Sequence, residues 1–138
     1  MAEGLFREMT KHQPDLQIGS AGVYAADGYP ASPEAVVALK EEGIDISNHR
    51  SRFLTQNLLN EADLIVVMTN SHRFHILQNF PEMTEKIRLL HEFNPEKVAN
   101  STNLDLQDPH SMGQAAYYKC RDSIKKSLPF ILNFIQMS

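Results

Sequence analysis

Hydrophobic and polar residues alternate along the 138 residues in a pattern that predicts alternating helices and strands. The chain opens with apolar side chains three and four positions apart, which indicates an amphipathic helix that ends at Pro14. Residues 16–23 (LQIGSAGV) then form a short apolar run interrupted by glycine, which predicts a strand that leads into a loop. A helix followed by a strand therefore begins the chain.

Capping residues predict the next two helices. Ser32 is a good N-cap, Pro33 suits the first helical position, and Gly43 marks the end of a helix of about three turns. An irregular polar stretch follows, after which Thr55 is expected to cap a short helix.

Residues 62–69 (ADLIVVMT) change the pattern to an uninterrupted run of branched apolar side chains. Such a run is typical of a strand buried on both faces in a parallel sheet. Ser71 is expected to cap the helix that follows, and Pro81 to end it. A last short strand is predicted for residues 87–90, and a loop for residues 94–113.

From Gln114 a long helix is predicted, with Pro129 expected to kink it. Its apolar stripe consists of Tyr117, Cys120, Ile124, Leu128, Ile131 and Ile135. The order of elements indicates an α/β fold with a doubly wound parallel sheet. In such a sheet each crossover helix has a strand before and after it, so we expect that a strand is missing ahead of Met1.

Composition narrows the function classes. The length suits a single domain over residues 1–138, and the net charge of -4 argues against nucleic acid or an anionic membrane surface as partner. The single cysteine cannot form an internal disulfide, which favours a reducing compartment, and we expect the cytoplasm. The longest apolar run is far shorter than a membrane-spanning helix of roughly 20 residues. We expect no cofactor and no metal.

Four segments in this order, SAGV (20–23), DISNHRSR (45–52), ADLIVVMT (62–69) and DLQDPHS (105–111), resemble the low-molecular-weight protein tyrosine phosphatase family, especially its bacterial members. The resemblance covers essentially the whole chain. It implies a flavodoxin-like sheet of four parallel strands whose first strand lies in the interior of the sheet. In that family this strand is followed by the phosphate-binding loop C-x-x-x-x-x-R-S and then by letters very like MAEGLFR. We therefore expect that the chain lacks the interior strand, the nucleophilic Cys and the phosphate-gripping Arg.

The resemblance also implies site residues. Asp108 matches the Asp-Pro motif that supplies the general acid, although Asp-Pro alone is a common turn pair. Ser20 and His49 match positions that support the phosphate loop from beneath; taken alone, each would be an ordinary turn or loop residue. Arg52 matches a basic position of the family and could equally be a solvated loop arginine.

Two further residues are expected at the substrate rim. Tyr24 falls where the family meets the substrate side chain, with Tyr29 as the competing candidate. His110 stands where bacterial relatives usually carry an aromatic residue.

Tyr117 is expected to pack against the sheet. Cys120 is expected to be a buried helical residue and no substitute nucleophile, because Lys126 stands where the motif needs Arg.

The expected function of the full-length form is hydrolysis of phosphotyrosine or phosphoarginine in protein substrates through a phosphocysteine intermediate, with the present chain inactive. The alternative is an inactive phosphatase-like domain that binds a partner. A response or nucleotide module fits least, since no Gly-rich phosphate fingerprint is present. Self-association through unpaired strand edges is a further expectation.

Overall fold

The computed structural model describes residues 1–24 and 26–137, so residue 25, in the loop after the first predicted strand, lies outside it. The chain divides into two compact units. The first unit comprises Met1–Phe53 and Pro109–Lys125, and the second comprises Leu54–Asp108 and Lys126–Ser138. A single domain over the whole chain stays a prediction.

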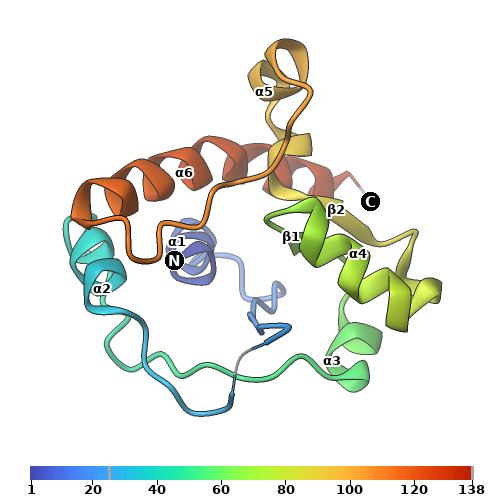
Figure 1. The fold of residues 1–138 in the computed structure, drawn as a ribbon, viewed down its shortest axis with the longest axis horizontal. Helices are drawn as coiled ribbons and strands as arrows, with labels where there is room; N and C mark the ends of the chain where they lie inside the picture. Colours follow the sequence, from blue (N-terminus) through green and yellow to red (C-terminus); the bar gives the residue numbers. More distant parts are fainter. Residues whose placement is uncertain (25, 138) are drawn as a thin grey trace. The chain divides into compact units, whose positions relative to one another are not determined.

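Two predicted helices of the first unit are confirmed as α1 (Ala2–Met9) and α2 (Pro33–Lys40) (Figure 1). The Ser32 hydroxyl accepts the N–H of Ala35 at 3.3 Å, as expected of an N-cap. The two helices pack closely at Gly4, where a Cβ atom would lie 2.9 Å from Cδ2 of Leu39. Glycine therefore allows the close approach of α1 to the buried face of α2.

The strand predicted for residues 16–23 is wrong as a regular element. In this segment only Gly22 forms a bridge, a parallel one with Phe53, and the rest pairs with no strand among the described residues. A strand is stabilised by hydrogen bonds to a neighbour, and no strand of the first unit supplies them. The apolar pattern of these residues was therefore not enough to form a regular strand without a neighbouring strand.

Among the described residues, the sheet lies in the second unit and is made of β1 (Ile65–Val67) and β2 (Ile87–Leu89). The strands are parallel, with Ile65 opposite Ile87 and Val67 opposite Leu89. Both predicted strands are thus confirmed, each shorter than predicted. The predicted burial of these strands is confirmed in part. Ile87 and Leu89 of β2 are buried, whereas in β1 Val67 is buried and the other two residues are half-buried.

The helices of the second unit correct two predictions. They are α3 (Gln56–Glu61), α4 (Asn70–Asn79), α5 (Pro95–Asn100) and the 3-10 turns η1 (Pro81–Met83) and η2 (Leu90–Phe93). Thr69, rather than Ser71, caps α4, because its hydroxyl accepts the N–H of His72 at 3.2 Å. The predicted loop contains α5, which begins at Pro95 with the Asn94 side chain as its N-cap.

The last helix, α6 (Gln114–Gln136), begins where it was predicted to begin. Its first part belongs to the first unit and its remainder to the second. Pro129 lies inside the helix, which continues to Gln136. Of the predicted stripe, every residue except Ile135 is buried. No helix among the described residues is both long enough and apolar enough to cross a membrane.

Candidate functional site

The first turn of α1 gathers the polar residues of the first unit around one carboxylate. Oε1 of Glu3 accepts a hydrogen bond from the Ser20 hydroxyl at 2.8 Å, and Oε2 lies 3.6 Å from Nδ1 of His49. Arg7, one turn later on the same helix, pairs with Oε2 through Nε at 3.2 Å. Glu3 therefore brings together Ser20 and His49, two residues predicted to act together.

The surroundings of Glu3 keep it ionised. Burial acts to raise the pKa of its carboxyl, but the hydrogen bonds from Ser20 and Arg7 and the positive charges of Arg7 and His49 outweigh burial, so the pKa lies below its ordinary value. The side chain is 19% exposed, so these partners contact a carboxylate that is largely removed from water. The result is a fixed negative charge in the first helical turn.

The beginning of α1 is partly enclosed. No side chain of Met1 caps the helix, and the Leu5 N–H donates to Met1 O at 3.0 Å. Burial lowers the pKa of the Met1 α-amino group below its ordinary value. The first N–H groups of a helix carry partial positive charge and have no partner within the helix, which makes this end suited to an anion.

Arg52 is tied to the backbone beside Ser20. Its Nε donates to Ser20 O at 2.8 Å, and a Cβ at Gly19 would lie only 2.4 Å from Nη2 of Arg52. Glycine at this position gives the guanidinium room to reach the carbonyl. Arg52 is exposed and bonded to the loop backbone, so the choice between a basic position of the family and a solvated loop arginine stays a prediction.

The two rim candidates lie on a loop that is fastened to residues 50–53. Tyr24 is 79% exposed and Tyr29 is 64% exposed, so both rings face solvent. The loop is held because the Ser51 N–H donates to Tyr29 O at 2.7 Å and the Phe53 N–H donates to the Asp27 carboxylate at 2.7 Å. Exposed aromatic rings are suited to contacts with a substrate side chain.

Asp108 and His110 lie on either side of the boundary between the units. Asp108 ends the segment of the second unit and is exposed, whereas His110 begins a turn of the first unit and is exposed as well. That turn is closed by the Met112 N–H, which donates to Pro109 O at 3.0 Å. Contacts within the first unit join Ser20 and His49 through Glu3.

Tyr117 and Cys120 pack in the interior. Tyr117 is 6% exposed and Cys120 is 8% exposed, both on α6. The burial of Cys120 confirms the prediction of a buried helical residue, and packing of Tyr117 against the sheet stays a prediction. Among the described residues no group of three His, Cys, Asp or Glu side chains could hold a metal ion.

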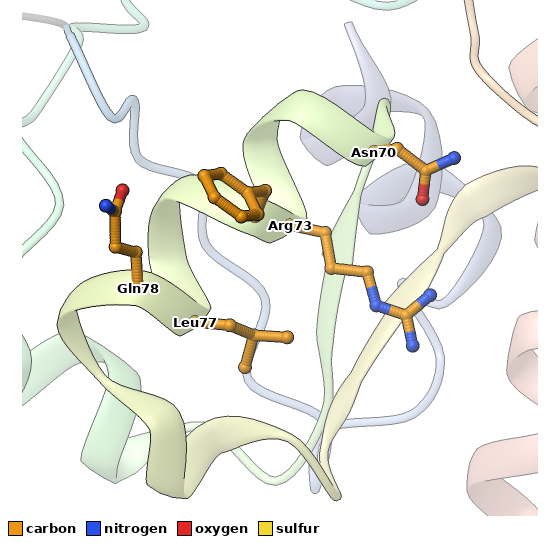
Figure 2. A pocket seen from close by; sticks show the side chains of 5 residues that line it. Asn70, Arg73, Leu77 and Gln78 are labelled. Atoms are coloured by element: carbon orange, nitrogen blue, oxygen red, sulfur yellow. The ribbon is translucent and has the colours of Figure 1, made fainter.

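A surface groove of about 520 Å³ lies on the second unit. The residues lining it all come from α4, and Figure 2 shows Asn70, Arg73, Leu77 and Gln78 along the helix. None of the predicted site residues borders this groove. Its position therefore gives no support to a role in catalysis.

Sequence reasoning missed Glu3, the residue that joins the predicted supports. A signal was available, because an acidic residue in the first turn of a helix compensates the helix dipole and is placed to accept hydrogen bonds there. Its contacts with Ser20 and His49 could not be anticipated, since they join positions 17 and 46 residues apart in the chain (20 − 3 and 49 − 3).

Comparison with known proteins agrees with the motifs. The profile of the low molecular weight phosphotyrosine protein phosphatase family matches residues 1–137. The chain belongs to this family. It is 36% identical over 117 residues to a probable low molecular weight protein-tyrosine-phosphatase, EpsP, of Ralstonia solanacearum, a match that covers 85% of this chain and 73% of the relative.

Other members of the phosphatase family carry a different description. The chain is 33% identical over 129 residues to the protein-arginine-phosphatase of Bacillus subtilis, covering 93% of this chain and 82% of that protein. The solved structure of the YwlE arginine phosphatase from Geobacillus stearothermophilus superimposes with a TM-score of 0.86 at 31% identity, covering 99% of this chain and 83% of that one. The α/β fold with an open parallel sheet, predicted from the sequence, is confirmed.

Proposed function

We propose that this chain is the scaffold of a phosphoprotein phosphatase that hydrolyses phosphotyrosine or phosphoarginine through a phosphocysteine intermediate. The names of its relatives include both a protein-tyrosine-phosphatase and a protein-arginine-phosphatase. The observation that carries the proposal is the Ser20–Glu3–His49 cluster at the first turn of α1, beside a helix end suited to a phosphate.

The nucleophile is proposed to be supplied by a strand and a C-x-x-x-x-x-R-S loop joined ahead of Met1. Cys120 is the one cysteine of the 138 residues; it is buried, and Lys126 stands six positions after it. One feature supports an additional strand: residues 16–21 have apolar strand character but pair with no strand among the described residues. The chain as given is proposed to be inactive.

In this proposal each site residue has a distinct task. Asp108 protonates the leaving group, and Pro109 restricts its backbone to extended conformations. Ser20 and His49 hold the phosphate loop in place through Glu3. Tyr24 and His110 meet the substrate at the rim, and phosphorylated protein is the substrate. The cytoplasmic location and self-association through strand edges remain expectations.

The test is to read the nucleotide sequence upstream of the Met1 codon in frame and to express the extended chain. An apolar strand followed by C-x-x-x-x-x-R-S-P is expected there, and stop codons or unrelated sequence would contradict the proposal. The extended chain should hydrolyse aryl phosphates, with the 138-residue chain as the inactive control. Turnover by the control that disappears with Cys120→Ser would show that the nucleophile has been misplaced.

Asp108→Asn in the active form tests the acid. We expect turnover of substrates with poor leaving groups to fall about 100-fold or more, with binding almost unchanged, since general acids contribute on this scale. Unchanged turnover would remove Asp108 from this role. A cooperative, inactive extended chain that still binds phosphopeptides would favour the alternative, a binding domain without catalysis.

A further inference from the structure

Residues 26–30 of the first unit, called the rim turn below, are held by hydrogen bonds rather than by apolar packing. All of these residues are exposed, so burial does not fix their backbone. Gly28 has a φ of 88°, in the left-handed region that suits glycine in a tight turn. Pro30 follows the turn and forms an antiparallel bridge with Arg50. The conformation of the rim turn therefore depends on its polar contacts with residues 50–53.

Ser51 contacts the rim turn through both its backbone and its hydroxyl. Its N–H donates to Tyr29 O at 2.7 Å, and its backbone O accepts the Gly28 N–H at 2.8 Å. Its Oγ accepts the Tyr29 N–H at 3.0 Å and donates to Ala26 O at 2.5 Å. Any residue other than proline can form the backbone bonds, whereas the bonds of Oγ need a hydroxyl. The side chain of Ser51 thus uses a donor and an acceptor on the same turn.

The backbone of Tyr29 is restricted on both sides. Its N–H and its carbonyl are both bonded to Ser51. Pro30 follows it, and a residue before proline is limited to extended conformations. Two residues earlier, the Asp27 carboxylate accepts the Phe53 N–H at 2.7 Å, which fastens the turn at a second point. The position of Tyr29 is therefore set before any ligand binds.

The segment that contains Ser51 also contacts the cluster around Glu3 in the first turn of α1. Nδ1 of His49 lies 3.6 Å from Oε2 of Glu3, and Nε of Arg52 donates to Ser20 O at 2.8 Å. Ser51 lies between His49 and Arg52 in the chain, and a step of two residues spans at most about 7 Å. The rim turn is therefore attached close to the Glu3 cluster, within the same unit.

The side chain of Tyr29 is 64% exposed although its backbone is held. The simplest interpretation of an exposed tyrosine is an ordinary surface residue. The held backbone points further, because an aromatic side chain on a fixed backbone loses little conformational freedom when it contacts a ligand. Its ring has apolar faces and a polar hydroxyl, which suits contact with a planar group that is itself partly polar.

We propose that Tyr29 is a specificity-determining residue for the phosphatase reaction and that Ser51 is its positioning residue. Tyr29 contacts the planar group that carries the phosphate, which is the phenyl ring of phosphotyrosine or the guanidinium of phosphoarginine. This proposal rests on the proposed function, in which the phosphate binds at the beginning of α1. It adds a second ring to the substrate rim, beside Tyr24.

A contact with the substrate side chain affects KM rather than kcat. The ring contact is equally strong in the bound substrate and in the transition state, so its loss raises KM and leaves kcat nearly constant. Inorganic phosphate has no side chain. Its inhibition constant should therefore not depend on Tyr29.

The first experiment uses the 138-residue chain and needs no activity. Amide hydrogen exchange of Gly28 is compared in Ser51→Ala, which lacks the hydroxyl, and in Ser51→Thr, which keeps one. The Gly28 N–H is bonded to the backbone O of Ser51, which every variant retains, so its exchange reports whether the hydroxyl holds the turn. We expect about fivefold faster exchange in Ser51→Ala, on the scale of one hydrogen bond, and little change in Ser51→Thr.

Two further variants complete this experiment. Ser71→Ala is the matched control, because it is the same change at an exposed serine of α4. Ser51→Val has the shape of threonine without its hydroxyl, and Gly28 should exchange as fast in it as in Ser51→Ala. Unchanged exchange in Ser51→Ala, or equal exchange in the Val and Thr variants, would overturn the positioning role of Ser51.

The second experiment uses the extended, active form with a phosphotyrosine peptide and a phosphoarginine peptide of otherwise identical sequence. For the peptide that is hydrolysed, we expect KM to rise about fivefold in Tyr29→Ala and less than about twofold in Tyr29→Phe, which keeps the ring. The value of kcat and the inhibition constant of inorganic phosphate should change by less than about twofold. Unchanged KM in Tyr29→Ala, or an equal rise in the inhibition constant of phosphate, would overturn the proposal.

The same assay tests whether Ser51 acts through Tyr29. Ser51→Ala should raise KM about twofold to threefold, and Ser51→Thr should restore it, since one lost hydrogen bond loosens the turn without removing the ring. In the Ser51→Ala/Tyr29→Ala double variant, KM should be no larger than in Tyr29→Ala. A larger KM in the double variant would show that Ser51 acts elsewhere and overturn its positioning role.

Failure of the proposed function gives a different result from failure of the role of Tyr29. If the extended chain hydrolyses neither peptide, the proposed function fails, and the substrate contact of Tyr29 fails with it. If the extended chain hydrolyses a peptide and KM is unchanged in Tyr29→Ala, the proposed function holds and the role of Tyr29 is wrong.

Discussion

The two units of the molecule are stabilised in different ways. The second unit has a parallel sheet in which both strands are present, so the apolar runs around Ile65 and Ile87 form a ladder. Among its described residues the first unit has helices but no sheet, and its apolar run at residues 16–21 has no regular strand structure. In this unit Glu3 instead joins polar side chains that are distant in the chain, through its contacts with Ser20 and His49.

The difference shows what a strand needs. Helices satisfy their backbone within themselves, so α1 and α2 form where capping and periodicity predict them. A strand depends on a neighbour for every hydrogen bond, so the same apolar character gives a strand in one unit and an irregular segment in the other.

Core truncations should affect the units differently. Leu39 and Ile87 are both 0% exposed, one in each unit, and replacement of either by alanine should cost about 2–5 kcal/mol of unfolding free energy. Hydrogen exchange should show loss of protection mainly in the unit that carries the change. Equal loss of protection in both units after either substitution would contradict this prediction and indicate a single cooperative domain.

Glu3→Gln should destabilise the first unit by about 1–2 kcal/mol, because hydrogen bonds to a carboxylate are stronger than those to an amide. The pKa of Glu3 lies below its ordinary value, so its contribution is present above the unfolded pKa and is lost as pH falls through the folded value. Urea melts between pH 7 and pH 3 should show a smaller acid loss in Glu3→Gln. An equal loss of unfolding free energy at acid pH in Glu3→Gln and in the unchanged chain would contradict this prediction.

Thr69→Ala should destabilise the second unit by about 1 kcal/mol, since its hydroxyl caps α4, whereas Ser71→Ala serves as the control within the helix and should change stability by less than about half of that. Chemical denaturation of the two variants measures the difference. A larger loss in Ser71→Ala would restore the cap predicted from the sequence.

Ser127→Ala should have the smallest effect, neutral or stabilising by up to about 1 kcal/mol. The residue is fully buried, and no hydrogen-bond partner of its hydroxyl is found among the described residues. Removing an unpaired buried hydroxyl relieves its desolvation cost without creating a large cavity. A clear destabilisation in thermal melts would show that the hydroxyl has a partner in solution.

Most local elements and the family could be predicted from the sequence. Caps and periodicity placed α1, α2, α3 and α6, and branched apolar runs placed β1 and β2, because these signals act between residues close in the chain. The motifs around Ser20, His49 and Asp108 indicated the phosphatase family, to which the chain belongs. The helix α5 was missed although Asn94 and Pro95 form a start signal.

How those residues work together depends on the tertiary structure. That Glu3 links Ser20 to His49 depends on contacts between residues far apart in the chain. Likewise, whether residues 16–23 became a strand depended on the presence of a partner. Local preferences are set by neighbouring residues, whereas pairing and burial are set by whichever distant segments the fold brings alongside.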